Sequence, residues 1–142
     1  MLRKTILLAA LASAGSHLDA QAQADRTATL LTPITESVSS ARLESTVRAL
    51  VGFGTRHTLS DTLSPTRGIG AARRWVRAEF ERISRDCGGC LEVLDVAEVF
   101  EGLPRVPGPT NVVSIVAIQR GTSDPGRFVL LSGDLDSRVS DI

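Results

Sequence analysis

The chain has 142 residues, which is enough for one domain or part of one. Its composition, 42% hydrophobic and 23% charged, is that of a soluble globular protein rather than a disordered or fibrous one. Sixteen basic and sixteen acidic residues cancel, which argues against a nucleic-acid partner. Two cysteines exclude a disulfide scaffold, and no apolar run reaches the roughly 18 residues that a membrane-spanning helix needs.

Residues 1–24 have the pattern of a secretory signal peptide. A short basic start is followed by an apolar stretch over residues 6–14, and small residues at 22 and 24 precede a cleavage site at Asp25. Cleavage after Ala22 is an alternative, and so is an uncleaved amphipathic helix. We expect an exported protein, periplasmic or extracellular, that has no membrane contact after cleavage.

The mature chain is predicted to begin with helices. Residues 25–39 are a lead-in segment that is polar and loose over residues 25–32 and forms a short helix from Thr32 to about Val38, and residues 40–142 form the N-terminal part of the domain. Ser40 is a candidate N-cap for a helix that two glycines, at 52 and 54, bring to an end. A loop over residues 55–66 follows.

The strongest helical pattern covers residues 67–84. Apolar residues recur there every three or four positions, which places one apolar stripe on one face. Arg73, Arg77 and Glu81 lie on another face, with Arg77–Glu81 and Glu81–Arg85 spaced to form ion pairs. Such a face can be an anion site or an ordinary solvated surface, and we expect the solvated surface.

The second half of the chain is predicted to form strands over residues 91–100, 111–118 and 128–131. The last two are too close for a parallel crossover and are expected to pair antiparallel. Both are continuous apolar runs, which predicts burial on two faces and requires helices on each side of the sheet. The fold class is therefore α/β, with N-terminal helices and the first strands of a mixed sheet. One sheet face is left bare, which is expected of the front part of a longer domain.

Cys87 and Cys90 form a Cys-x-x-Cys motif between the main helix and the first strand. A redox motif needs its first cysteine at a helix N-terminus, and a zinc site of this type needs two more ligands at suitable spacing. Neither condition is met in the sequence. A local disulfide is therefore expected in an oxidising compartment.

Two aspartates directly after the last strand are the candidate functional residues. Asp134 and Asp136 point to one side of an extended segment, so their carboxylates repel unless a cation lies between them. A divalent metal or Arg138 would supply that charge, and a plain polar loop capped by Asp136 is the alternative. His57 is expected to be structural, and Trp75 to serve packing.

The chain resembles the start of the catalytic domain in the M28 zinc peptidase family. The resemblance covers about residues 40–142, and four segments in the same order carry it: Val51–His57, Ala71–Trp75, Thr110–Val113 and Phe128–Arg138. It implies a three-layer α/β/α fold with two zinc ions, and an exported exopeptidase, mostly an aminopeptidase, that cleaves peptide substrates at their free N-termini.

The resemblance also implies roles for the two aspartates. The family motif at this strand end is His-x-Asp-Ser, in which the histidine binds zinc and the aspartate supports the ligands. Asp136 matches that aspartate and is the implied catalytic residue, whereas Asp134 occupies the histidine position and is the implied metal ligand. Aspartate is a harder ligand than histidine, so either the metal preference is altered or the site is weakened. The family's other ligands would lie beyond Ile142, so the 142-residue chain alone is expected to be inactive.

Two other functions fit the same sequence. One is a non-catalytic secreted binding domain on this fold, which Asp134 in place of histidine favours. The other is an acyltransferase of the glutaminyl-cyclase type. The sequence leaves the preferred N-terminal residue, the identity of the metal and the oligomeric state open.

Overall fold

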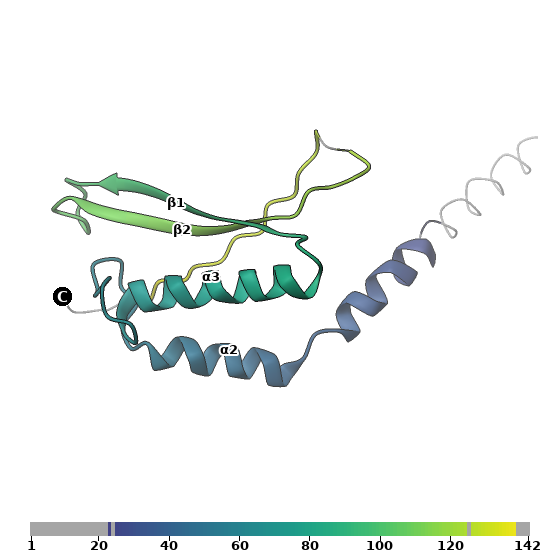
Figure 1. The fold of residues 1–142 in the computed structure, drawn as a ribbon, viewed down its shortest axis with the longest axis horizontal. Helices are drawn as coiled ribbons and strands as arrows, with labels where there is room; N and C mark the ends of the chain where they lie inside the picture. The colour runs from purple at the N-terminus through teal and green to yellow at the C-terminus, as the bar shows by residue number, and fades with distance from the viewer. Residues whose placement is uncertain (1–22, 24, 125, 139–142) are drawn as a thin grey trace, which may run out of the picture. The chain divides into compact units, whose positions relative to one another are not determined.

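The computed structural model describes residues 23, 25–124 and 126–138, so the signal peptide predicted over residues 1–24 lies outside it except for residue 23. A helical segment over residues 25–36 comes first. It is followed by α2 (Ser40–Gly52), α3 (Gly68–Asp86), β1 (Glu92–Phe100) and β2 (Thr110–Ile118) (Figure 1). The chain divides into two compact units, Met1–Glu44 and Ser45–Ile142.

The loose structure predicted for residues 25–32 is wrong, because residues 25–36 are helical. The short helix predicted from Thr32 is the last part of this helix. Threonine hydroxyls in this helix form hydrogen bonds with main-chain carbonyls four residues earlier. Thr27 Oγ1 donates to the carbonyl of Gln23 at 2.9 Å, and Thr29 Oγ1 donates to the carbonyl of Asp25 at 2.8 Å. These hydroxyls are paired with carbonyls of the preceding turn, so the threonines are compatible with the helix. No helix in the described part of the chain is long and apolar enough to cross a membrane.

Helix α2 ends as predicted at Gly52 but is capped one residue earlier than predicted. The side-chain oxygen of Ser39, not Ser40, accepts a hydrogen bond from the Arg42 N–H at 3.3 Å. A cap must precede the first helical turn to reach its free N–H groups, and Ser40 is already inside the helix. The chain then turns at Gly54, whose φ of +68° favours glycine.

The predicted loop and the predicted long helix α3 are both confirmed. The first turn of α3 holds the hydrophobic core of the described residues, Ile69, Ala71 and Ala72. The preceding loop covers it closely: Ser60 Oγ accepts from the Ile69 N–H at 2.9 Å, and the Asp61 carbonyl accepts from the Gly70 N–H at 3.1 Å. Glycine at 70 permits this approach, as there is no Cβ to separate the two backbones.

The loop depends on one carboxylate. Asp61 Oδ1 accepts hydrogen bonds from the main-chain N–H groups of Leu63 (2.7 Å) and Ser64 (2.9 Å). These bonds, that from Ser64 first, lower the pKa of Asp61 below its ordinary value of 3.8. Because the pKa is lowered in the folded state, the carboxylate stabilises the fold above about pH 4, and this contribution is lost as the pH falls through the folded pKa.

Asp61→Asn is therefore expected to destabilise the protein at pH 7 and to have a smaller effect at pH 3. Asparagine keeps an acceptor oxygen but loses the charge that strengthens the two bonds. Urea unfolding of wild type and variant at both pH values measures the difference, with Asp124→Asn as the control for removal of a carboxylate elsewhere. A destabilisation of equal size at both pH values would contradict this role of the charge.

Strands β1 and β2 form an antiparallel two-stranded sheet in which Glu92 pairs with Ile118 and Phe100 with Thr110. Both strands match their predicted ranges within one residue. Helix α3 packs on one face of the sheet. On the other face, Leu94, Val96 and Phe100 stay 38–55% exposed. This face is uncovered among the described residues, as the sequence predicted.

The predicted third strand is wrong. Residues 128–131 are irregular, do not pair with β2, and have side chains that are 78–91% exposed. Burial of β2 on both faces is wrong too, because none of its residues is fully buried. An apolar run indicates that a segment is suited to burial, but a strand forms only where a partner edge and a covering layer exist. Residues 128–131 do not pair with the open edge of β2 and are not covered by any described element, so the described residues show a small α/β arrangement rather than three layers.

Candidate functional site

The segment that carries Asp134 and Asp136 is held by the loop after α2. Arg56 makes most of this connection: its main-chain N–H donates to Ser137 Oγ at 2.8 Å, and its Nε donates to the Leu135 carbonyl at 3.0 Å. The Ser137 N–H in turn donates to the Arg56 carbonyl at 3.3 Å. Main chain and side chain of one arginine thus bind both residues that flank Asp136.

The same guanidinium reaches a helix end. Arg56 Nη1 donates to the Leu50 carbonyl at 2.5 Å, in the last turn of α2. Carbonyls in the last turn of a helix have no partner within the helix, and a cation there is favourable for the helix dipole. Arg56 therefore joins the C-terminal end of α2 to residues 135–137, which lie about 80 positions later in the sequence.

The two aspartates differ in their surroundings. Asp136 Oδ2 accepts a hydrogen bond from Thr58 Oγ1 at 3.4 Å, so the same loop contacts its carboxylate. Both aspartates are exposed, and no ion pair joins Arg138 to either one among the described residues. The predicted arginine counter-charge between the carboxylates is therefore not observed, and Asp134 remains open to a ligand.

His57 lies in the same loop, next to Thr58. Its Nδ1 accepts a hydrogen bond from the Leu59 N–H at 3.1 Å. In the neutral ring the proton is then on Nε2, which makes that nitrogen a donor rather than a metal ligand. This is the structural role expected from the sequence.

The described residues do not make a zinc site by themselves. No group of three or more His, Cys, Asp or Glu side chains is placed to hold a metal ion in the described ranges. A catalytic zinc ion is held by three protein ligands, and Asp134 and Asp136 offer two carboxylates at most. Any complete metal centre would need ligands from outside the part of the chain described.

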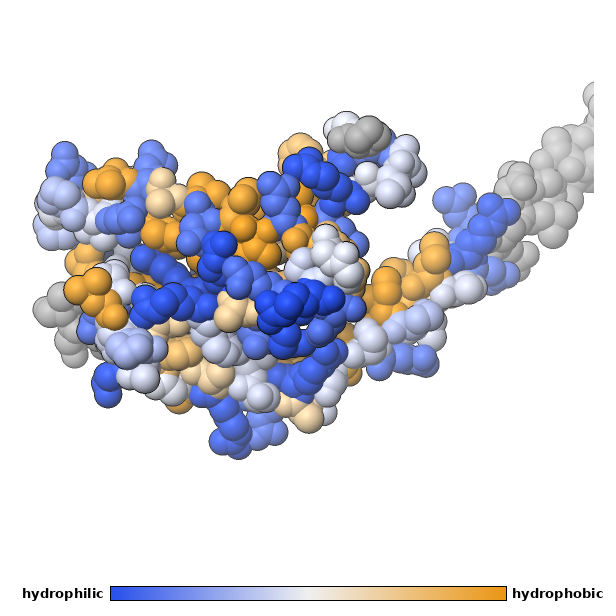
Figure 2. Space-filling model, in the orientation of Figure 1, coloured by the Kyte–Doolittle hydropathy of each residue, from blue (hydrophilic) through white to orange (hydrophobic). Residues whose placement is uncertain are grey.

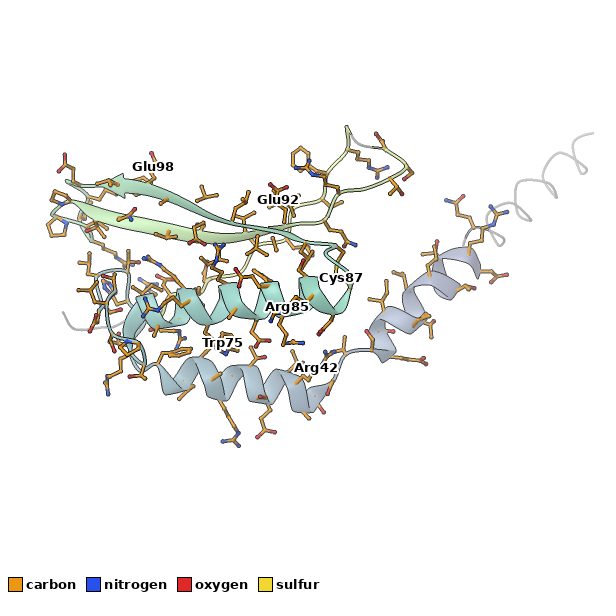
Figure 3. The ribbon with its side chains drawn as sticks, in the orientation of Figure 1. Arg42, Trp75, Arg85, Cys87, Glu92 and Glu98 are labelled. Carbon is orange, nitrogen blue, oxygen red and sulfur yellow. A yellow bond between two sulfur atoms is a disulfide. The ribbon has the colours of Figure 1, made fainter. Side chains whose placement is uncertain are left out.

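Two further predictions concern the main helix. Cys87, at its C-terminal end (Figure 3), is joined by a disulfide to Cys90, with Cα atoms 5.6 Å apart. Trp75 packs against Phe53, with ring centroids 6.2 Å apart and ring planes at 56°. Trp75 thus has the packing role that was expected, and it ties α3 to the turn after α2.

Arg56 and Thr58 were missed by sequence reasoning. Both lie within or beside the segment that carries the family resemblance, but no role was inferred for either. A single sequence gives no signal that pairs residue 56 with residues 135–137. The only local hint is an arginine that follows Gly54 and Thr55 in a turn, where a side chain can reach back to a helix end.

The chain is similar to fungal proteins named probable zinc metalloproteases. It is 41% identical over 107 residues to one from Leptosphaeria maculans, which is 75% of this chain and 25% of that protein. It is 44% identical over 105 residues to one from Pyricularia oryzae, covering 74% of this chain and 21% of that protein. One from Pyrenophora tritici-repentis is 39% identical over 117 residues, covering 78% and 26% respectively.

The chain therefore spans about a quarter of the length of the curated relatives it matches. No protein-family model matches it, and no solved structure is significantly similar to it. These relatives agree with the coarse expectation of a metal-dependent protease. They do not identify the M28 family or an aminopeptidase.

Proposed function

We propose that this chain is the N-terminal part of an exported zinc metallopeptidase of the M28 type, an exopeptidase that removes residues from the free N-termini of peptides. The similarity to proteins named probable zinc metalloproteases, over about three quarters of the chain, carries the proposal. The signal-like N-terminus supports export. The uncovered sheet face supports a larger, three-layer domain.

In this proposal the chain supplies one edge of the metal centre. Asp134 is the exposed carboxylate ligand, and Asp136 is the supporting carboxylate that Thr58 contacts. Zinc would supply an activated water and polarise the scissile carbonyl. Since the described residues hold only these two carboxylates, the remaining ligands belong to the parts of the protein that are not described. Arg56 fixes this segment through its hydrogen bonds to Leu135 and Ser137, the residues on either side of Asp136.

The test uses the gene product that carries this chain, assayed with aminoacyl 4-nitroanilides. We expect chelator-sensitive hydrolysis that zinc restores. Asp136→Asn is expected to lower kcat/KM about 10–100-fold, the usual cost of removing a group that supports a metal ligand. Asp124→Asn, an exposed aspartate in the turn after β2, is the matched control and should retain wild-type activity.

Other outcomes separate the alternatives. A well-folded product that binds peptides but hydrolyses no anilide, with or without metal, would favour the binding domain, for which Asp134 in place of histidine already argues. Cyclisation of an N-terminal glutaminyl peptide without anilide hydrolysis would favour the acyltransferase. Hydrolysis that survives both the chelator and Asp136→Asn would refute the proposed metal centre.

A further inference from the structure

A pocket of about 290 Å³ lies between α3 and the sheet, and neither Asp134 nor Asp136 lines it. Its polar lining consists mainly of Arg73, Arg74 and Arg77 from α3, with Asp95 from β1 and Asn111 from β2. Figure 2 shows the hydrophilic band over α3 beside the hydrophobic residues of the sheet. Arg73 is partly buried, so the prediction of an ordinary solvated arginine face is wrong for this residue. It holds for Arg77, whose side chain is 37% exposed and forms the predicted ion pair with Glu81.

Two of the three guanidinium groups are committed to partners. Arg77 Nη1 donates to Asp95 Oδ1 at 2.6 Å and its Nε pairs with Glu81 at 2.9 Å, which raises the pKa of Arg77, chiefly through Asp95. Arg74 donates to the main-chain carbonyls of Thr62 and Ser64. These contacts fix both side chains at the pocket wall and leave some of their N–H groups free, because a guanidinium has five donors.

Arg73 is different. Its Nε is buried and has no hydrogen-bond partner among the described residues. Burial lowers the pKa of Arg73, and no carboxylate among the described residues offsets this effect. Asp95, the carboxylate in the lining, is taken by Arg77. A buried N–H without an acceptor is unfavourable, and the described residues give Arg73 no counter-charge, so an anion bound to its Nη groups from the pocket would stabilise this side chain.

We propose that this pocket is a binding site for a small oxyanion, a carboxylate or phosphate group held by Arg73 with Arg74 beside it. Three positive groups against one carboxylate give the lining an excess of positive charge. The planar guanidinium fork matches the geometry of both oxyanions. Val113 and Ile115, on the sheet side of the pocket, provide an apolar wall for the organic part of a ligand. This site does not depend on the proposed peptidase function.

The test follows the Arg73 Nε–Hε signal by NMR in the full chain, at pH 7 and with EDTA present, so that metals play no part. Inorganic phosphate and 3-methylbutanoate are titrated separately, against sodium chloride at equal ionic strength. We expect the Arg73 signal to shift and saturate with at least one of the two anions, but not with chloride. Tighter binding of 3-methylbutanoate would identify an organic acid as the ligand class, and tighter binding of phosphate a phosphate compound.

Variants separate this site from general charge attraction. Arg73→Met is expected to raise the dissociation constant at least tenfold, followed at the signals of Arg74 and Asn111. Arg73→Lys keeps the charge and the fold but lacks the fork, and is expected to bind several-fold more weakly than wild type. Arg85→Met, exposed in the last turn of the same helix (Figure 3), should bind as wild type. The proposal is overturned if no saturable shift occurs, if chloride reproduces the shift, or if Arg73→Met binds normally.

Discussion

Gly70→Ala is expected to lower the free energy of unfolding by about 2 kcal/mol. A Cβ at this position would overlap the main chain of Thr62, lying 2.6 Å from its Cα. Overpacking against backbone costs up to about 3 kcal/mol, because the neighbour cannot rotate away as a side chain can. Alanine recovers up to about 1 kcal/mol through its better helix propensity, so the net effect is still a clear loss.

The effect is large because the core is small. Among the described residues the buried hydrophobic side chains are Ile69, Ala71 and Ala72, in the same turn of α3 as Gly70. Displacing the loop would open this core to water. Urea unfolding measures the change, and Gly108→Ala, with no atom within 4 Å of the added Cβ, is the control and should change stability by less than about 0.5 kcal/mol. A stabilised Gly70→Ala variant would mean that the loop yields at no cost.

Arg56→Met is expected to release residues 135–137 from the loop after α2. It removes the guanidinium bonds to the Leu135 and Leu50 carbonyls and leaves the main-chain contacts with Ser137 and the hydrogen bond from Thr58 to Asp136. The loss of these charged hydrogen bonds corresponds to about 2 kcal/mol of local stability. The amide of Ser137, which donates to the Arg56 carbonyl, should then exchange its hydrogen about 30-fold faster, at about 1.4 kcal/mol for each tenfold change.

Amide hydrogen exchange of residues 133–138 provides the measurement. Arg74→Met is the matched control, because Arg74 also donates to two main-chain carbonyls but contacts the loop before α3 instead. It should leave exchange at Ser137 unchanged. Arg56→Lys is expected to fall in between, since one ammonium cannot replace a fork that reaches two carbonyls in different directions. Unchanged exchange in Arg56→Met would show that the remaining contacts alone hold the segment.

Elements with strong local patterns could be predicted from the sequence. The apolar spacing in α3 and the β-branched residues of β1 and β2 specify structure through contacts that exist within or between neighbouring segments. The helix over residues 25–36 was predicted only from Thr32 onward, because the threonines before it have low helix propensity. The strand predicted over residues 128–131 is wrong because an apolar pattern indicates a preference for burial but does not indicate whether the segment pairs with another strand.

The candidate sites show the same limit. The position of Asp134 and Asp136 after an apolar run could be read directly, but the loop that holds them could not. That contact joins residues about 80 positions apart, and only the folded chain brings them together. The burial of Arg73 could not be predicted from the sequence either. A helical pattern places it on a face with Arg77, and the register of the sheet then decides that this face meets Asp95.

The two-stranded sheet has a practical consequence for work with this polypeptide. Each strand has one long side on which main-chain N–H and C=O groups meet no other strand of the described residues. Such open edges are templates for intermolecular pairing, above all beside exposed valine and leucine. Concentrated samples are therefore expected to form β-rich aggregates. Dilute refolding at low temperature, or a charged substitution on the exposed face of a strand such as Val96→Lys, should keep the material monodisperse.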